Sequence, residues 1–310
     1  MEPVTPDHIR YIKLGRGGRW AQRGLAHGEV HFGYRMVPHE VCLDEDWEAI
    51  AGLLMERGRS PAKAKDGVRE IRDFYTLGAD CLWITFADGH LWWTFADTEV
   101  IWLGTDDDAC GARMRKAIDG WRKTDIRGKP LGIDGLSTIL TQVAAYRQTI
   151  CRVRASDYLL RRINALEEPV VRRAQAAKAE MVEVAVDMSA SLQWADFETL
   201  VDLIFARTGW QRISRVGGPR KDVDLVVQQP TTGETAFVQV KSRATQAVLE
   251  DYVERFRASE GYDRMFLVCH SPRGELRASD ESDVRVWAGK SLAEAAVRAG
   301  LFDWIIARVA

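Results

Sequence analysis

Cysteine is scarce in this chain of 310 residues, and the five cysteines present are far apart. They lie at positions 42, 81, 110, 151 and 269, and no two of them form a C-x-x-C pair. Neither a zinc site nor a disulfide framework is therefore indicated. We expect buried, reduced thiols.

Long apolar runs are also missing. No run reaches the roughly 18 residues that a membrane-spanning helix needs, and residues 1–6 lack the basic start and apolar stretch of an export signal. With 46% apolar and 28% charged residues, the composition is ordinary for a globular protein. These features predict a cytoplasmic protein, and the length allows two domains with separate cores.

Net charge is small, at −2, but the charged residues are unevenly distributed. Residues 111–180 hold 15 Lys and Arg against 7 Asp and Glu, whereas residues 1–110 hold 12 against 19. A local basic excess on a nearly neutral chain suits a partner that carries phosphates. A solvated helical face would produce the same composition, so both interpretations remain open here.

The first 110 residues predict a small mixed sheet with two helices. Asp88-Gly89 lies between two aromatic-rich runs and is a strong hairpin signal, because both central residues of a type I′ turn need positive φ. From apolar periodicity we expect strands at 8–14, 29–35, 81–86, 91–95 and 99–103, and helices at 44–57 and 61–77.

Residues 111–187 predict a basic helical connector, and residues 188–310 predict an α/β sandwich. In the connector we expect helices at 113–123, 135–151 and 158–186, the last interrupted at Pro169. Beyond it, helix, three strands, helix, two strands and helix follow in order. The helices are expected at 194–207, at 246–259 and from 291, and the strands at 211–216, 222–228, 236–241, 264–269 and 284–287. The predicted domains are therefore 1–110, 111–187 and 188–310.

Three polar residues interrupt two apolar strands of the last domain. Asp224 opens one strand, and Gln239 and Lys241 are two residues apart in the next, so that their side chains share a face. Pairing of the two strands would bring an acid, an amide oxygen and an ammonium to one sheet edge. Such a set suits phosphodiester hydrolysis, in which a carboxylate holds a hard divalent cation and a lysine stabilises the developing charge.

Glu198, on the preceding helix, could add a carboxylate to the metal shell, directly or through water. Any one of these residues alone would favour a structural role, such as a strand cap or a charge that protects an edge strand. Their ordered combination favours a catalytic site.

The same region carries a series of ordered motifs: Trp194-x-x-Phe197-Glu198-x-x-Val201, Gly209-Trp210, Gly217-Gly218, Asp222-Val223-Asp224 and Gln239-Val240-Lys241. Over residues 190–300 this series resembles the Mrr-type restriction endonuclease domain of the PD-(D/E)xK superfamily. The resemblance implies that Asp224 is the metal-binding acid, Gln239 a variant second ligand and Lys241 the catalytic lysine. It also implies that Glu198 is the helix acid and that the cofactor is Mg²⁺ or Mn²⁺.

One departure from the family concerns the residues before the metal-binding acid. The family usually has two glycines between an upstream Asp and that acid, whereas this chain has Asp222-Val223. Asp222 either substitutes for the upstream acid or faces solvent. We favour Asp224 over Asp222 as the metal ligand.

The N-terminal domain combines glycines, arginines and aromatic residues. Gly15, Gly17 and Gly18 allow a ligand to approach the backbone, and Arg16 and Arg19 flank them beside Trp20. This combination suits a nucleic-acid backbone with a base stacked nearby. An ordinary glycine turn with solvated arginines is the alternative.

The stretch from Ile12 to Trp20 and the tryptophan-rich hairpin resemble PUA-like readers of modified bases, including EVE domains, over residues 8–105. Such readers accept a flipped base in an aromatic pocket. The candidates for this pocket, of which only two or three can be right, are Trp20, Tyr34, Trp83, Trp93 and Trp102. Arg147, in the basic middle region, contacts a phosphate or the base pocket, or forms a structural salt bridge.

Fusion of such a reader to an Mrr-type nuclease implies a type IV, modification-dependent restriction endonuclease. We expect it to bind double-stranded DNA carrying a modified base such as 5-methylcytosine, and to act as a homodimer, at least on DNA. Two alternatives stay open: a nuclease whose N-terminal domain senses a small molecule, and a DNA-binding protein that does not cleave.

Overall fold

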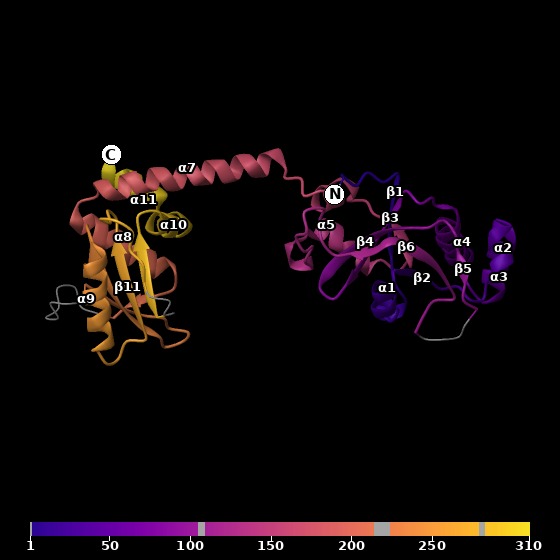
Figure 1. The fold of residues 1–310 in the computed structure, drawn as a ribbon, viewed down its shortest axis with the longest axis horizontal. Helices are drawn as coiled ribbons and strands as arrows, with labels where there is room; N and C mark the ends of the chain where they lie inside the picture. Colours follow the sequence, from indigo (N-terminus) through magenta and orange to yellow (C-terminus); the bar gives the residue numbers. More distant parts are fainter. Residues whose placement is uncertain (1, 105–108, 214–223, 279–282) are drawn as a thin grey trace. The chain divides into compact units, whose positions relative to one another are not determined.

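The computed structural model describes residues 2–104, 109–213, 224–278 and 283–310 (Figure 1). The described chain is mixed α/β, as expected, and divides into two compact units, Met1–Glu168 and Pro169–Ala310. Among the described residues, no helix combines the length and the apolar character required to cross a membrane.

Unit 1 is built on a mixed sheet. Its strands are β1 (His8–Ile12), β2 (Glu29–Phe32), β3 (Cys81–Ala87), β4 (His90–Ala96), β5 (Ile101–Trp102), β6 (Arg113–Arg122) and β7 (Ile150–Arg152). The strand order is β2-β6-β4-β3-β1-β7, and β5 pairs with β6. The pair β1 and β3 is parallel, and the other pairs are antiparallel. The predicted hairpin is confirmed: β3 and β4 pair around Asp88 and Gly89, whose φ angles are 48° and 70°.

The helices of unit 1 follow the prediction only in part. They are α1 (Ala21–His27), α2 (His39–Leu43), α3 (Trp47–Glu56), α4 (Pro61–Thr76), α5 (Thr138–Thr141) and α6 (Ser156–Ile163), with 3-10 turns at Arg16–Gly18, Ile133–Gly135 and Gln142–Ala145. The helices expected at 44–57 and 61–77 are confirmed as α3 and α4. Helices α1 and α2 were not predicted.

The helix expected at 113–123 is wrong, because this segment is β6, a strand of the sheet. Arg113 and Arg115 belong to the basic excess of residues 111–180, for which a solvated helical face was one interpretation. Both side chains are instead fully buried on one face of the strand. The Arg113 guanidinium donates to the carbonyls of Tyr34 and Val37 at 3.0 and 2.7 Å. These backbone acceptors replace water and make the burial of a cation tolerable.

The single helix expected at 135–151 is also wrong. Its residues instead form two 3-10 turns and the short helix α5, and the chain then extends into β7. The pairing of β7 with β1 explains the difference, since Ile12 pairs with Ile150 and Tyr11 with Cys151. This long-range pairing outweighs the local helical pattern.

Both faces of the unit 1 sheet are covered. Trp83 belongs to the core beneath α1–α4, and its neighbour Ile84 belongs to the core beneath α5 and α6. Successive side chains of a strand point to opposite faces. The same alternation places Trp92 against the first core and Trp93 in the second. Packing therefore accounts for both tryptophans of this adjacent pair.

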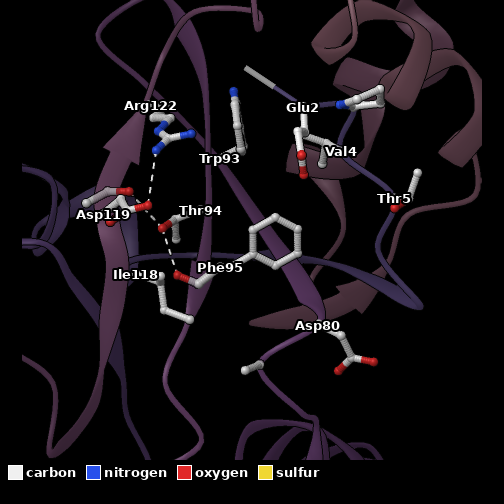
Figure 2. A pocket seen from close by; sticks show the side chains of 13 residues that line it. Glu2, Val4, Thr5, Asp80, Trp93, Thr94, Phe95, Ile118, Asp119 and Arg122 are labelled. Atoms are coloured by element: carbon white, nitrogen blue, oxygen red, sulfur yellow. Dashed lines mark hydrogen bonds and ion pairs between the residues drawn. The ribbon is translucent and has the colours of Figure 1, made fainter.

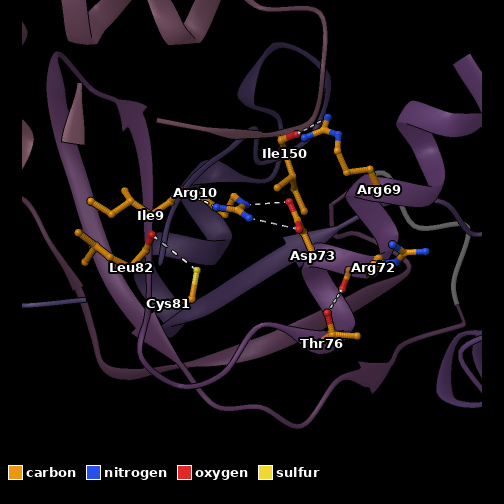
Figure 3. A network of polar contacts seen from close by, with 9 residues as sticks. All are labelled: Ile9, Arg10, Arg69, Arg72, Asp73, Thr76, Cys81, Leu82 and Ile150. Atoms are coloured by element: carbon orange, nitrogen blue, oxygen red, sulfur yellow. Dashed lines mark hydrogen bonds and ion pairs between the residues drawn. The ribbon is translucent and has the colours of Figure 1, made fainter. Parts of the chain in front are cut away.

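Polar contacts tie α4 to the sheet (Figure 3). Arg10 of β1 forms an ion pair with Asp73 of α4, with 2.7 Å between Nε and Oδ2. Arg69, one turn earlier, donates to the carbonyl of Ile150 in β7 at 3.3 Å. These contacts fix the helix against the β1 and β7 edge.

Unit 2 is an α/β sandwich, as expected. Its strands are β8 (Gln211–Arg212), β9 (Leu225–Gln228), β10 (Thr235–Lys241), β11 (Arg264–Cys269) and β12 (Val284–Ala288), in the order β12-β11-β10-β9-β8. Its helices are α7 (Pro169–Ser191), α8 (Trp194–Arg207), α9 (Gln246–Arg257), α10 (Lys290–Arg298) and α11 (Phe302–Val309). The core on one sheet face is shared with α8, α10 and α11, and the core on the other face with α9.

Of two predictions for this region, one is confirmed and the other is matched in part. The expected interruption at Pro169 is confirmed, since α7 begins at this residue. Of the strand expected at 211–216, β8 covers the first two residues. Residues 214–223, which include Gly217-Gly218 and Asp222, lie outside the described residues.

Candidate functional site

Asp224 lies one residue before β9, next to the partner strand β10. The two strands are antiparallel, with Leu225 opposite Val238, so the same register places Asp224 opposite Gln239. The backbone N–H of Val240 donates to Asp224 Oδ2 at 2.8 Å. Gln239 Nε2 donates to the same oxygen. The acid and the amide expected at the site are therefore in direct contact.

The amide oxygen of Gln239 has an unusual environment. The side chain is only 2% exposed, and its Oε1 atom is buried without a hydrogen-bond donor among the described residues. A buried acceptor without a partner costs about 1–3 kcal/mol. A bound cation or an ordered water would remove that cost, and Asp224 next to it favours a cation.

Lys241 ends β10 on the same strand face as Gln239. Its Nζ atom lies 5.4 Å from the ring centroid of Tyr252 in α9, the distance of a cation–π contact. The partly buried ammonium is thus held at the end of the strand and remains accessible.

Glu198 projects from the first half of α8. Burial raises the pKa of its carboxyl group, and the negative charge of Asp224 raises it further. The positive charges of Arg212 and Lys241 lower it. Glu198 therefore lies within electrostatic range of both Asp224 and Lys241. Two carboxylates that repel each other are the usual surroundings of a divalent cation.

The donor set fits a hard divalent cation. Asp224, Glu198 and the orphaned Gln239 oxygen are all oxygen donors, which such a cation prefers. Among the described residues, no group of three or more His, Cys, Asp or Glu side chains is placed to hold a metal ion. A cation here would therefore need the amide oxygen, main-chain carbonyls or water in addition to the two carboxylates. The alternative acid, Asp222, lies outside the described residues.

A cavity of about 690 Å³ in unit 1 collects several of the predicted base-binding residues. Arg16, Trp20, Tyr34 and Arg147 all line it, although they come from three separate segments. A Cβ atom at Gly15 would lie 2.7 Å from the Trp20 ring, so this ring position requires glycine there. The volume falls within the range of about 300–1,000 Å³ typical of ligand pockets.

Tyr34 is held in an unfavourable backbone conformation beside this cavity. Its φ angle is 61°, which is rare for a bulky residue and costs of order 1–3 kcal/mol. Its hydroxyl donates to Glu70 Oε2 at 2.8 Å, and the guanidinium of Arg59 lies 4.9 Å from its ring centroid. The guanidinium of Arg113 donates to the Tyr34 carbonyl and so fixes the backbone at this residue. Backbone strain of this kind concentrates at functional sites.

The other predicted reader residues do not line this cavity. Arg19 lies over the Trp20 ring, 5.2 Å from its centroid. Trp83 is fully buried in the core. Trp93 lines a second cavity, of about 530 Å³, beside Asp119 and Arg122 (Figure 2). Trp102 is 36% exposed and stacks on His39.

Helix α4 makes a contribution to the cavity that was not predicted. Asp66, Gly67 and Glu70 line it, and Glu70 is only 3% exposed. Its Oε1 accepts from the backbone N–H of Thr149 at 3.0 Å. Burial raises the pKa of the Glu70 carboxyl group. The available signal was an acid on the apolar helix face, one residue before Ile71.

The geometry of unit 2 defines a class of protein. It is an α/β sandwich in which two carboxylates, an amide and an ammonium lie near one another. These groups are the ones that a cation-assisted phosphodiester hydrolase needs.

Comparison with known families gives a more specific assignment. Residues 189–295 match the Mrr catalytic family, described as restriction endonuclease. This part of the chain is a restriction endonuclease domain, and the protein is a DNA endonuclease that hydrolyses phosphodiester bonds. Domains of this type generally use divalent metal ions.

Two further comparisons concern the whole chain. No curated protein sequence matches it. A solved structure of the MspJI restriction endonuclease in complex with a 27-mer oligonucleotide is similar at 14% identity and a TM-score of 0.29. The similarity covers 92% of this chain and 74% of that chain. A TM-score this low does not establish a shared fold.

Replacing Lys241 tests the ammonium. Lys241→Ala is expected to slow DNA cleavage by at least about 100-fold, the loss typical of a removed transition-state donor, with DNA binding retained. Lys290→Ala is the matched control, because Lys290 forms only an exposed ion pair with Glu183. Plasmid cleavage rates measure the effect, and equal rates for both variants would contradict the assignment.

Replacing Gln239 tests the cation site. Gln239→Glu places two carboxylates side by side in a buried position, so without divalent ions the melting temperature should fall by about 2–4 °C for each kcal/mol of repulsion. Mg²⁺ or Mn²⁺ should restore it and stabilise this variant more than the wild type. Calorimetry with and without a chelator checks both expectations. Exposed Gln211→Glu is the control, and a loss that divalent ions leave unchanged would argue against a cation at Gln239.

Proposed function

We propose that the protein is a modification-dependent restriction endonuclease. Unit 1 binds double-stranded DNA that carries a modified base such as 5-methylcytosine, and unit 2 hydrolyses a nearby phosphodiester bond with Mg²⁺ or Mn²⁺. The observation that carries the nuclease part is the contact between Asp224 and Gln239, beside Glu198. The observation that carries the reader part is the cavity lined by Trp20 and Tyr34.

The chain's own residues divide the work of hydrolysis. Asp224, Glu198 and the Gln239 oxygen would hold the divalent cation, which would supply a Lewis acid for the phosphate and for a water molecule. Lys241 orients the attacking water or stabilises the charge that develops on the phosphate. The ring of Tyr252 keeps the Lys241 ammonium at the end of the strand.

The cavity of unit 1 has the parts that a flipped base requires. The Tyr34 ring offers aromatic surface for stacking, and Trp20, which is 7% exposed, forms part of the wall. Arg16 and Arg147 line the same cavity as phosphate contacts. Gly17, with a φ of 65°, leaves room for the DNA backbone to approach.

Glu70 favours a base of the cytosine type. As a carboxylate, it accepts a hydrogen bond from an exocyclic amino group such as N4 of cytosine. The Tyr34 hydroxyl and the Thr149 N–H hold its two oxygens in place. Thymine presents no amino group at this position, so Glu70 would discriminate against it.

The same cavity supports a second candidate function, namely a nuclease activated by a small molecule. Its volume of about 690 Å³ also suits a nucleotide-sized ligand. An enzyme that cleaves no modified DNA until a small molecule is added would favour this alternative.

For either function, a cut through both strands needs two active sites, so we propose that the enzyme acts as a homodimer.

Digestion of methylated and unmethylated plasmid tests the reader directly. The methylated plasmid should be cut at least about tenfold faster, which corresponds to roughly 1.4 kcal/mol of base recognition. A chelator should stop both reactions, because the carboxylates lose their cation. Equal rates on the two plasmids would remove the reader and leave the nuclease.

Replacing Tyr34 tests the cavity. Tyr34→Asn keeps a residue that tolerates positive φ and removes the ring, so binding to methylated duplex should weaken by about 1–3 kcal/mol, the value of one stacked base. Trp102→Ala is the control, because Trp102 is a half-exposed aromatic residue outside this cavity. Fluorescence anisotropy with methylated and unmethylated duplexes provides the measurement. An unchanged preference in Tyr34→Asn would place the base elsewhere.

A further inference from the structure

The first half of α7 is exposed along its whole length. Every residue from Pro169 to Met181 is exposed, and the helix first becomes buried at Val182. Figure 1 shows this part of α7 extending past the other helices of the same unit. Exposed helices shorter than about 12–15 residues are marginally stable in water. A partner that covers this segment would stabilise it.

The exposed part of α7 carries an apolar stripe. Val170, Ala174, Ala177, Met181 and Val184 follow one another at alternating intervals of four and three residues. This is the a/d spacing of a coiled coil. Its large members are well exposed, at 63% for Val170, 38% for Met181 and 39% for Val184.

This stripe differs from the face that packs inside unit 2. Val182 and Ala185 form the buried face, in a cluster with Ala293 of α10. They are one residue further along the helix than Met181 and Val184, and therefore about 100° around it. The helix thus has two apolar faces, and unit 2 covers one of them.

Charge is distributed along α7 in a self-complementary way. The basic residues Arg172, Arg173 and Lys178 lie in its first half, and the acidic residues Glu180 and Asp187 lie at its middle and in its second half. Glu183 also lies in the second half and pairs with Lys290 of α10. Two copies side by side in parallel would place like charges together. Two antiparallel copies would place the basic half of each helix against the acidic half of the other. Charges that flank an apolar stripe set the partner and orientation of paired helices.

We propose that α7 is the dimerisation element of this protein and that its occupant is α7 of a second copy, in antiparallel orientation. A self-complementary stripe with opposite charges at its two ends is what a two-fold symmetric interface requires. The inference names the interface of the homodimer in the proposed function. A helix pair of this kind would link two nuclease domains, and so two active sites, in one molecule.

Sedimentation of the full chain tests the interface without any use of DNA. The wild type should form a species of twice 35.0 kDa that dissociates on dilution. Ala177→Glu puts a charge into the stripe and should weaken the dimer at least tenfold. Ala179→Glu is the matched control, since it makes the same change two residues away on the opposite face and should leave the dimer intact. Both substitutions keep a strong helix former.

A charge exchange tests the orientation. Arg173→Glu or Asp187→Arg alone should weaken the antiparallel pair, and the double variant should recover the wild-type association. A parallel pair would not be rescued in this way. A wild-type monomer at all concentrations would overturn the proposal. Dimers that are equally stable in Ala177→Glu and Ala179→Glu would overturn it as well.

The plasmid products separate this inference from the proposed function. Dilute Ala177→Glu should nick supercoiled plasmid and produce little linear DNA, whereas wild type and Ala179→Glu should linearise it. If the wild type cuts no DNA, the proposed function fails, and the sedimentation results still decide the interface.

Discussion

The site in unit 2 depends on one contact, in which the Gln239 amide donates to Asp224 across the β9 and β10 pair. Because the amide nitrogen faces the carboxylate, the amide oxygen is turned into a buried position where no donor among the described residues meets it. The carboxylate of Glu198 adds a second negative charge within range, and its raised pKa reflects that neighbour as well as burial. An arrangement with an unpaired oxygen acceptor and two neighbouring carboxylates favours the binding of a cation. The nuclease activity given by the family match therefore has a physical basis in these strands.

Unit 1 shows a related use of buried polar groups. Arg113 is fully buried, and its terminal nitrogens donate to two carbonyls, one of them that of Tyr34. The same Tyr34 adopts a positive φ and donates to the buried Glu70. The wall of the cavity therefore depends on a strained residue, a buried acid and a buried cation, each of which lowers the stability of the fold. Backbone strain of this kind is common where a ligand binds.

Local signals in the sequence predicted much of this fold. Helix α8 begins and ends where its apolar spacing indicated, the hairpin turns at Asp88-Gly89, and a new helix begins at Pro169.

The errors in the predicted elements came from long-range effects. The arginines of β6 resemble a solvated helix until the carbonyls that surround them are known, and β7 exists because β1 offers an edge. In the same way, the antiparallel pairing of two short strands was enough to predict that Asp224 and Gln239 meet. The sequence could not predict which aromatic residues line the unit 1 cavity, because Trp20 and Tyr34 are brought together with Arg147 only by the fold.

We propose that Asp224 and the Gln239 oxygen share a divalent cation. Crystals grown with Mn²⁺ would test this, because the anomalous signal of manganese locates the ion. We expect an anomalous peak about 2.0–2.3 Å from Asp224 and from Gln239 Oε1, the range of oxygen ligands to small divalent ions. A peak elsewhere in the domain, with only a water molecule on the Gln239 oxygen, would contradict it.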